Sequence, residues 1–456
     1  MVTVIKRDKI IDLLLDKQKL SADTKKFRLL SFAKLETVGE DYVLYNNLTK
    51  EMVRLDKEEF ICLERLEKSG ELDKTLIPLY EGFFIVPFDN DDVKLSLQVA
   101  AFSKNLRASR HRNLFTILTT SDCNARCYYC FENGQRRIHM SEKTARDVAS
   151  YIINNCDKSL PVTLNWFGGE PLYNKGVIDV IISELEKANV SYKSTMISNG
   201  YLFDDETVKQ AKEKWNLKRV QITLDGTEDV YNKAKNYIYE GVNPFKVVIE
   251  NIKKLIDAEI KVQVRLNYDE DNADNLLELI DYLYDNVGNS KYIYVYPHQI
   301  FDTSPSSDFA VNKKRQLSMF EIGLKITRRI DEKGFKPKSY LDKTVKYCSC
   351  MADSGKPNLI HPDGNLGCCE HFTDSEVYGN IYEGVKSKEL LDAWSEKHDV
   401  LTICHDCPLF PTCFKLKKCP SALSCSDYQK DYEIKNFSLS IANTYEYVKT
   451  KKETDA

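Results

Sequence analysis

The sequence predicts an α/β protein built around a partial (β/α)6, TIM-like barrel, with a small winged-helix-like module before it and a cysteine-rich domain after it. Strand-like and helix-like segments alternate six times in the middle of the chain, two short strands joined by a turn precede them, and nine of the 14 cysteines follow them. Six alternations favour a parallel sheet, which right-handed crossovers can curl into an open barrel.

The N-terminal module is assigned to residues 1–102. The segment from Asp41 to Leu55 has the pattern of strand, turn and strand, a helical stretch begins at Lys57, and a short apolar segment occupies residues 82–87. Residues 103–113 are polar and basic with no apolar period, and we expect them to form a linker.

The barrel is assigned to residues 114–338. Its predicted strands are short, apolar and rich in β-formers: residues 114–119, 162–167, 194–198, 219–224, 261–267 and 292–296. Helical stripes lie between them, one behind a cap at Ser141 and another at Val248, Ile252, Leu255 and Ile256. Ligands in such folds bind at the carboxyl ends of the strands, so side chains just past each strand are the candidates for chemistry.

Composition narrows the class of protein. The 456 residues carry 65 basic and 69 acidic side chains, a net charge of -4 that gives no sign of a nucleic-acid partner. No signal peptide is apparent, and the apolar runs are far shorter than the ~20 residues of a membrane span, so we expect a cytoplasmic protein with no membrane partner. In a reducing cytoplasm, 14 cysteines favour metal or redox chemistry over disulfides.

Three cysteines follow the first barrel strand directly, in the segment SDCNARCYYCFE. Cys123, Cys127 and Cys130 form a CxxxCxxC arrangement, for which chance predicts on the order of 0.01 occurrences in a chain of this length and composition. Three thiolates on one loop can hold three irons of a [4Fe-4S] cluster and leave the fourth iron open to a ligand. A three-cysteine zinc site with a distant fourth ligand, or reduced cysteines at a sheet edge, are the alternatives.

With Tyr129 before the last cysteine, this loop resembles the signature of the radical S-adenosylmethionine (radical SAM) enzymes. Further matches follow successive strands: WFGGEP at residues 166–171, ISNG at 197–200, LDG at 224–226 and VRLN at 264–267. The resemblance implies that S-adenosylmethionine (AdoMet) contacts Tyr129, Gly168, Gly169, Glu170, Ser198, Asn199 and Asp225. Where family members often have His and Arg after LDG, this chain has Tyr231 and Lys235, which we leave out of the predicted site. No catalytic residue is assigned.

The nine later cysteines lie in residues 339–430, a region with little apolar period that we expect to owe its fold to metal. Their spacing resembles the SPASM domain of peptide-modifying radical SAM enzymes, which holds two auxiliary [4Fe-4S] clusters. The resemblance assigns Cys404, Cys407, Cys413 and Cys425 to the outer cluster, and Cys350, Cys369, Cys419 and one of Cys348 or Cys368 to the inner one. A zinc ribbon is the alternative, because Cys404 and Cys407 form a CxxC pair. Residues 431–456 are expected to be a C-terminal helix or tail.

The leading interpretation is a radical SAM peptide maturase. The N-terminal pattern resembles the RiPP recognition element, which binds leader peptides of ribosomally made precursors; a structural cap on the barrel is the alternative. We therefore expect a precursor peptide and a reductase such as flavodoxin or ferredoxin as partners, and a crosslink, a cysteine thioether, as the product. An anaerobic sulfatase maturase that forms formylglycine, and a non-catalytic metal-binding scaffold, are the other hypotheses. Cys62 and Cys156 are expected to be ordinary packing residues.

Overall fold

The computed structural model describes residues 1–21, 23–300, 313–335, 341, 350–354, 357–372, 375–397, 399–413, 416–419 and 427–454. Cys348 and Cys425, two of the predicted cluster ligands, lie outside the described residues. The chain forms two compact units. The first comprises Met1–Ala108, Ser339–Ser349 and Glu396–Ala456, and the second comprises Ser109–Lys338 and Cys350–Ser395.

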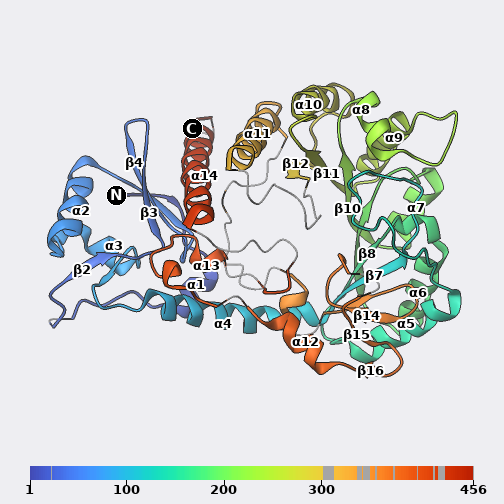
Figure 1. The fold of residues 1–456 in the computed structure, drawn as a ribbon, viewed down its shortest axis with the longest axis horizontal. Coiled ribbons are helices and arrows are strands. Elements are labelled where there is room, and N and C mark those ends of the chain that lie inside the picture. The colour runs from blue at the N-terminus through green and yellow to red at the C-terminus, as the bar shows by residue number, and fades with distance from the viewer. Residues whose placement is uncertain are drawn as a thin grey trace. The chain divides into compact units, whose positions relative to one another are not determined.

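The second unit is built on six parallel strands in chain order, as in a partial (β/α)6 barrel (Figure 1). They are β7 (Leu114–Thr120), β8 (Val162–Gly168), β9 (Tyr192–Ser198), β10 (Leu217–Leu224), β11 (Lys261–Tyr268) and β12 (Ile293–Gln299). All six predicted strands are confirmed, with ends that shift by at most three residues.

Helices connect these strands or follow the last of them, and they cover the outer side of the sheet (Figure 1). They are α5 (Glu142–Asn155), α6 (Gly176–Lys187), α7 (Asp205–Glu213), α8 (Glu228–Lys235), α9 (Pro244–Asp257), α10 (Ala273–Val287) and α11 (Lys313–Glu332). The predicted cap holds, because the Ser141 side chain accepts a hydrogen bond from Thr144 N.

Burial alternates along the strands, and this sets which side chains face the barrel interior. On β10, Val220, Ile222 and Leu224 are fully buried on the side of the helices, whereas Gln221 and Thr223 between them are partly exposed. Since successive side chains of a strand point to opposite faces, the inner face of the sheet is polar.

Part of the cysteine-rich region extends this sheet. Strand β13 (Leu359–Ile360) pairs in parallel with β7 and is followed by three antiparallel neighbours. These are β14 (Asn365–Gly367), β15 (Val377–Asn380) and β16 (Gly384–Val385), after which comes α12 (Lys388–Ser395). The edge of β7 is thereby paired.

The first unit contains a four-stranded antiparallel sheet in the order β1-β5-β4-β3 and a separate pair of β2 with β6. Its strands are β1 (Val2–Ile5), β2 (Phe27–Leu29), β3 (Ala33–Val38), β4 (Asp41–Asn46), β5 (Glu51–Leu55) and β6 (Ile85–Pro87). Helices α1 (Lys9–Leu14), α2 (Lys57–Ser69) and α3 (Ile77–Glu81) complete the module. The predicted strand, turn, strand and helix are confirmed, and α2 begins with a capping box of Asp56 and Glu59.

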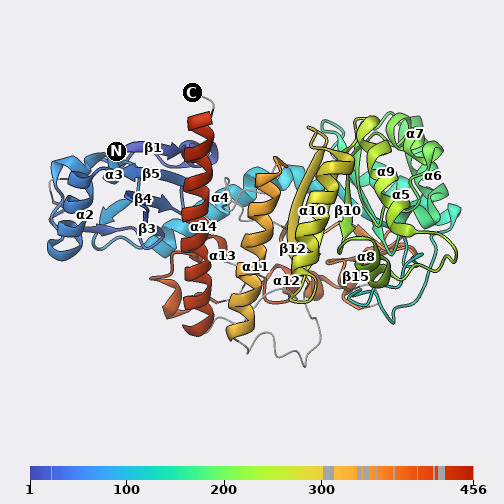
Figure 2. The same ribbon diagram turned by 90° about the horizontal axis from the view of Figure 1, so that it is seen from above.

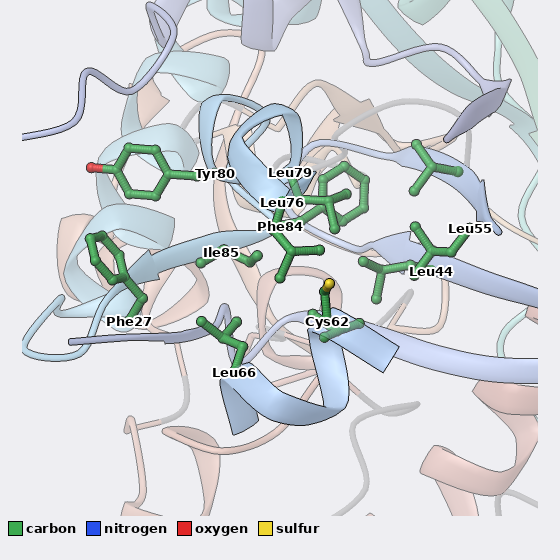
Figure 3. Close-up of a cluster of buried hydrophobic side chains, with 12 residues drawn as sticks. Phe27, Leu44, Leu55, Cys62, Leu66, Leu76, Leu79, Tyr80, Phe84 and Ile85 are labelled. Atoms are coloured by element: carbon green, nitrogen blue, oxygen red, sulfur yellow. The ribbon is translucent and has the colours of Figure 1, made fainter. Parts of the chain in front are cut away.

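An apolar cluster lies between this sheet and α2, and Cys62 belongs to it (Figure 3). Leu44 and Leu55 from the sheet pack with Leu66 of α2 and Phe84, all almost inaccessible to solvent. The expectation that Cys62 is a core residue is confirmed.

The other face of the sheet is covered from the far end of the chain. Helix α14 (Asp427–Thr454) packs against β3 and β4, with Phe437, Ile441 and Tyr445 buried against Val43 and Tyr45 (Figure 2). The short helix α13 (Phe410–Cys413) places Phe410 against Phe32, with ring centroids 5.8 Å apart. The cysteine-rich region is thus shared between the two units, which differs from the single domain expected from sequence.

Residues 103–112, expected to be a linker, belong to α4 (Asp92–Arg112). The connector is therefore helical. Of the helices in the described ranges, none combines the length and the apolar character that crossing a bilayer requires.

Candidate functional site

The loop with Cys123, Cys127 and Cys130 follows β7 at the carboxyl end of the parallel sheet. The segment after α8 fastens it by backbone hydrogen bonds. Arg126 N donates to Lys235 O at 2.9 Å and to Asn236 O at 3.1 Å, and Ile238 N donates to Asn124 O at 3.0 Å. The backbone of the cysteine loop is therefore held by the backbone of residues 235–238.

Two glycines let the end of β8 lie against this loop. Gly168 has a φ of +125°, and a Cβ there would stand 2.0 Å from Thr120 O; at Gly169 a Cβ would stand 2.3 Å from Asp122 O. Gly169 N donates to Thr120 O at 3.1 Å, and Glu170 N donates to Asp122 O at 3.0 Å. A side chain at either position would separate the two segments, so the glycines serve the contact between strand end and cysteine loop.

Glu170 joins β8 to β9 and is fully buried. Its carboxylate accepts hydrogen bonds from Ser198 Oγ at 2.9 and 3.1 Å, from Asn199 N at 2.8 Å and from Leu172 N at 3.1 Å. Burial raises the pKa of Glu170 to about 7, while these donors act to lower it. The side chain thus holds the ISNG segment in place.

Asn199 in turn reaches the cysteine loop. Its Nδ2 lies 2.6 Å from Asn124 Oδ1 and 3.8 Å from Cys123 Sγ, and Ala125 N lies 3.4 Å from the same sulfur. Two donors are therefore aimed at Cys123, as suits a thiolate that ligates iron.

Tyr129, Lys235 and Asp225 form a second buried group beside the loop. Lys235 Nζ donates to Tyr129 Oη at 2.8 Å and lies 3.2 Å from Asp225 Oδ2, and both charged side chains are almost fully buried. Burial acts to lower the pKa of Lys235, but Asp225, Tyr129, Cys127 and Tyr231 together outweigh it, and the pKa lies above its usual range. Sequence reasoning placed Tyr129 and Asp225 in the site and left out Lys235, which lies between them.

The donor set fits the cofactors of a radical SAM site. The three cysteines of the loop are thiols, partly exposed, and can ligate three irons of a [4Fe-4S] cluster. Within the described ranges, no three His, Cys, Asp or Glu side chains are already gathered around one point as for a single metal ion. Oδ1 of Asp225 and Nδ2 of Asn124 are buried without a hydrogen-bond partner among the described residues, so the site offers an acceptor and a donor to a polar ligand such as AdoMet.

The later cysteines are divided between the units. Cys350, which is exposed, and the buried Cys368 and Cys369 belong to the barrel unit, the last two directly after β14. Cys404, Cys407, Cys413 and Cys419 belong to the first unit. Their assignment to two auxiliary clusters remains a prediction.

In the first unit, Cys404 and Cys407 pack with an apolar cluster that includes Leu30, Phe32 and Phe410. Asn47 reinforces this contact, since its Nδ2 donates to Pro408 O at 2.8 Å. The CxxC turn therefore rests on the N-terminal module, a placement that spacing alone did not reveal.

Asn124 and Lys235 are site residues that sequence reasoning missed. Asn124 is fully buried, and its side chain accepts a hydrogen bond from Asn199. The only feature of the sequence that points to it is its position inside the CxxxCxxC motif. Lys235 lies ten residues after Asp225, at a position where members of the family often have Arg. Its backbone and side chain both contact the cysteine loop, which this difference alone did not indicate.

Comparison with known proteins agrees with this geometry. Residues 117–283 match the family model of the radical SAM superfamily. The chain contains a radical SAM domain. With this domain the chain is an enzyme, radical SAM domains bind AdoMet and a [4Fe-4S] cluster, and the hypothesis of a non-catalytic scaffold is not supported.

Two curated relatives show the range of proteins to which the chain is similar. GTP 3',8-cyclase of Clostridium perfringens (strain SM101 / Type A) is 26% identical over 293 residues, which are 62% of this chain and 88% of that protein. The sporulation killing factor maturation protein SkfB of Bacillus subtilis (strain 168) is 25% identical over 167 residues, 36% of this chain and 38% of that protein.

Among solved structures, the sulfatase maturase anSMEcpe with bound AdoMet superposes with a TM-score of 0.58 at 14% identity, over 74% of this chain and 99% of that one. At this identity the similarity concerns the fold alone.

Proposed function

We propose that the chain is a radical SAM peptide maturase that installs a crosslink, a thioether from a cysteine sulfur to a carbon, in a ribosomally made precursor peptide. When bound, the loop cluster supplies an electron that cleaves AdoMet to methionine and a 5'-deoxyadenosyl radical, which removes a substrate hydrogen atom. Cys123, Cys127 and Cys130 hold that cluster, and the side chains of Glu170, Asn199 and Lys235 fix the surrounding segments.

The observation that carries the choice of a peptide is the N-terminal module. It has its own apolar core and a four-stranded sheet in which β3, among the described strands, pairs only with β4. The other edge of β3 can accept an extended peptide as a further strand. Similarity to SkfB, a maturation protein, supports the same choice. A winged-helix-like leader-binding role for residues 1–102 is part of this proposal.

Two auxiliary [4Fe-4S] clusters belong to the proposal as well. Cys404, Cys407 and Cys413, with Cys425, would hold one in the first unit, and Cys350 and Cys369 would contribute to the other together with Cys419 and one of Cys348 or Cys368. Full ligation by protein leaves no open iron, which favours electron transfer over direct contact with the substrate. A flavodoxin or ferredoxin is the expected reductase.

The test is co-expression of the chain with the short open reading frames that flank its gene, followed by mass spectrometry of the peptides. A thioether appears as the loss of two hydrogen atoms per crosslink, at a cysteine that no longer reacts with iodoacetamide. The sulfatase-maturase alternative produces formylglycine instead, an aldehyde that hydroxylamine traps. An aldehyde in place of a blocked cysteine would replace the thioether proposal.

The role of β3 has its own test. Hydrogen-bonded and non-hydrogen-bonded pairs alternate between β3 and β4, starting with the hydrogen-bonded pair of Val38 and Asp41 at the turn. The next pair, Thr37 with Tyr42, is therefore non-hydrogen-bonded, and Thr37 N–H points away from β4. Thr37→Pro removes this outward donor, while Thr37→Ala keeps it. We expect Thr37→Pro to lower peptide modification with AdoMet cleavage intact, and Thr37→Ala to behave as the wild type. Equal modification by both variants would contradict strand addition at this edge.

A further inference from the structure

The inner face of β11 carries Arg265, which lies in the VRLN segment but to which the family resemblance assigns no role. Along this strand Val262, Val264 and Leu266 are fully buried towards the helices, whereas Gln263 and Arg265 alternate with them and are partly exposed. Arg265 therefore faces the barrel interior with Gln263.

Its neighbours on both sides belong to the same interior surface. Arg265 is paired in register with Thr223 of β10 and with Tyr296 of β12. Tyr296 Oη spans the strand between them and donates to Gln221 Oε1 at 2.7 Å. Two residues after Thr223 stands Asp225, so Arg265 lies beside the candidate AdoMet site.

The guanidinium of Arg265 lacks an acidic partner. Its Nη2 lies 2.8 Å from His298 Nδ1, the Nε is buried with no hydrogen-bond partner, and no carboxylate of the described residues forms an ion pair with it. Burial lowers the pKa of Arg265, and the nearby Tyr296, Tyr129 and Asp225 act against that shift. A largely buried cation without a counter-charge is costly unless an anion completes the site.

The buried cation beside the cysteine loop, Lys235, is already neutralised. Lys235 lies 3.2 Å from Asp225 Oδ2, so this pair carries no net charge. Arg265, in contrast, has no ion pair with a carboxylate of the described residues. A guanidinium offers a planar fork of donors whose shape matches the two oxygens of a carboxylate.

A second unpartnered polar atom lies on the same strand. Asn267 is buried, and its Oδ1 has no hydrogen-bond donor among the described residues. Positions two apart on a strand share a face at a spacing of roughly 6.6 Å, so Asn267 and Arg265 face the same interior volume. A ligand that joins a carboxylate to an ammonium or amide N–H would satisfy both side chains.

We propose that Arg265 binds a carboxylate in the barrel interior, with His298, whose Nδ1 lies 2.8 Å from both Arg265 Nη2 and Gln299 O, as the positioning residue. Two molecules of the reaction can supply that group: the methionine carboxylate of AdoMet, and an Asp or Glu side chain of the substrate peptide. The proposal concerns the shared chemistry, and the experiment separates the two sources.

The first arm measures binding of AdoMet and of decarboxylated AdoMet to the cluster-reconstituted chain by equilibrium dialysis. The variants are Arg265→Gln, which removes the charge, Arg265→Lys, which keeps the charge without the fork, and the control Arg219→Gln. Arg219 lies on the inner face of β10 but is exposed at its amino end. Iron content and far-UV circular dichroism show whether each variant folds with its clusters.

If AdoMet supplies the carboxylate, Arg265→Gln loses about tenfold or more in affinity for AdoMet but little for the decarboxylated analogue, Arg265→Lys falls between, and Arg219→Gln matches the wild type. Weaker binding of both ligands by the same factor means a structural role for Arg265 and overturns the proposal.

The second arm uses the co-expressed precursor peptide with each Asp or Glu changed in turn to Asn or Gln. If the substrate supplies the carboxylate, Arg265→Gln binds AdoMet as the wild type does, yet modifies the peptide about tenfold less, and one acid-to-amide change in the peptide lowers modification by the wild type equally. The two changes together then cost no more than either alone.

Unchanged behaviour of Arg265→Gln in both arms overturns the proposal. If the wild type modifies no co-expressed peptide, the proposed peptide function is wrong, and the carboxylate proposal stands or falls on the AdoMet arm alone.

Discussion

The loop of Cys123 to Cys130 and the turn of Cys404 to Cys407 both carry proposed iron ligands, but they are held by different forces. The first lies at the ends of parallel strands and is fixed by backbone hydrogen bonds to segments after β8 and α8. The second is a short turn packed on apolar side chains of the N-terminal module, and Asn47 donates hydrogen bonds to Pro408 O and Thr412 Oγ1 just after it. The sheet thus prepares one loop before any metal binds, whereas the other depends on packing and on its cluster.

Removal of the loop thiols should have the largest effect. Cys123→Ala, Cys127→Ala and Cys130→Ala each remove a ligand of the radical cluster, and we expect AdoMet cleavage to be abolished with a loss of about four irons per chain. Formation of 5'-deoxyadenosine after anaerobic reduction and iron analysis measure this. The buried Cys62→Ala is the matched control and should keep both. An unchanged yield of 5'-deoxyadenosine in the loop variants would mean that the site is misplaced.

The backbone contact of the same loop is the next target. Gly169→Ala would place a Cβ 2.3 Å from Asp122 O, so the end of β8 must move away from the cysteine loop. We expect AdoMet cleavage to fall by about two orders of magnitude and the free energy of unfolding to fall by roughly 1–3 kcal/mol. Gly176→Ala, which meets no atom within 4 Å at the start of α6, should keep full cleavage. Cleavage is measured with saturating AdoMet, and equal rates in the two variants would contradict a fixed loop.

The packed turn should respond to Asn47 instead. Asn47→Ala removes the hydrogen bond to Pro408 O from a side chain that is almost fully buried, at a cost of roughly 1–3 kcal/mol. We expect Cys404 and Cys407 to react faster with iodoacetamide in the cluster-free chain, while the loop cysteines keep their rate. Mass spectrometry of the labelled peptides measures this. Replacement of the exposed Asn286 by Ala serves as the control. If Asn47→Ala changes the iodoacetamide rates of the turn cysteines and the loop cysteines equally, the two segments are not held by different forces.

The smallest expected effect is a pH dependence of the first unit. Asp92 is buried and accepts hydrogen bonds from Arg28 at 2.7 and 3.1 Å and from Ser31 N at 2.8 Å. Burial acts to raise the pKa of Asp92, but the hydrogen bonds from Arg28, Ser31 and Asn90 together outweigh it, and the pKa lies below its usual value. The interaction therefore stabilises the fold above the carboxyl pKa of the unfolded chain, near 3.9, and is lost as the pH falls through the lower folded value.

Asp92→Asn removes that contribution, so its free energy of unfolding should be lower at neutral pH and should decline less steeply on acidification than that of the wild type. Denaturant titrations between neutral pH and the acid limit of the native state measure both. Parallel curves for the two proteins would show that Asp92 is not responsible for the pH dependence.

Sequence reasoning succeeded where the physical signal is local. Strand and helix periods located β7 to β12 to within a few residues, and the CxxxCxxC spacing put three thiolates on one loop behind β7. In the structure Glu170, Ser198 and Asn199 are joined by hydrogen bonds, because residues that follow parallel strands meet at one edge; their contact with AdoMet stays a prediction. Polarity alone predicts a linker at residues 103–113, whereas residues 103–112 are helical in the structure, since a polar stretch can extend a helix that packing elsewhere stabilises.

The sequence by itself thus determined the α/β class, the strand that each motif follows or lies in, and which cysteines share the loop after β7. These features depend only on periodicity and short spacings between neighbouring residues. The tertiary structure alone decided that the two glycines of GGEP press on the cysteine loop, that Lys235 stands between Tyr129 and Asp225, that the late cysteines are shared between two units, and that Arg265 lacks a counter-charge. Each of these depends on which segments distant in the sequence come into contact, and on which hydrogen-bond or ion-pair partners each side chain has there.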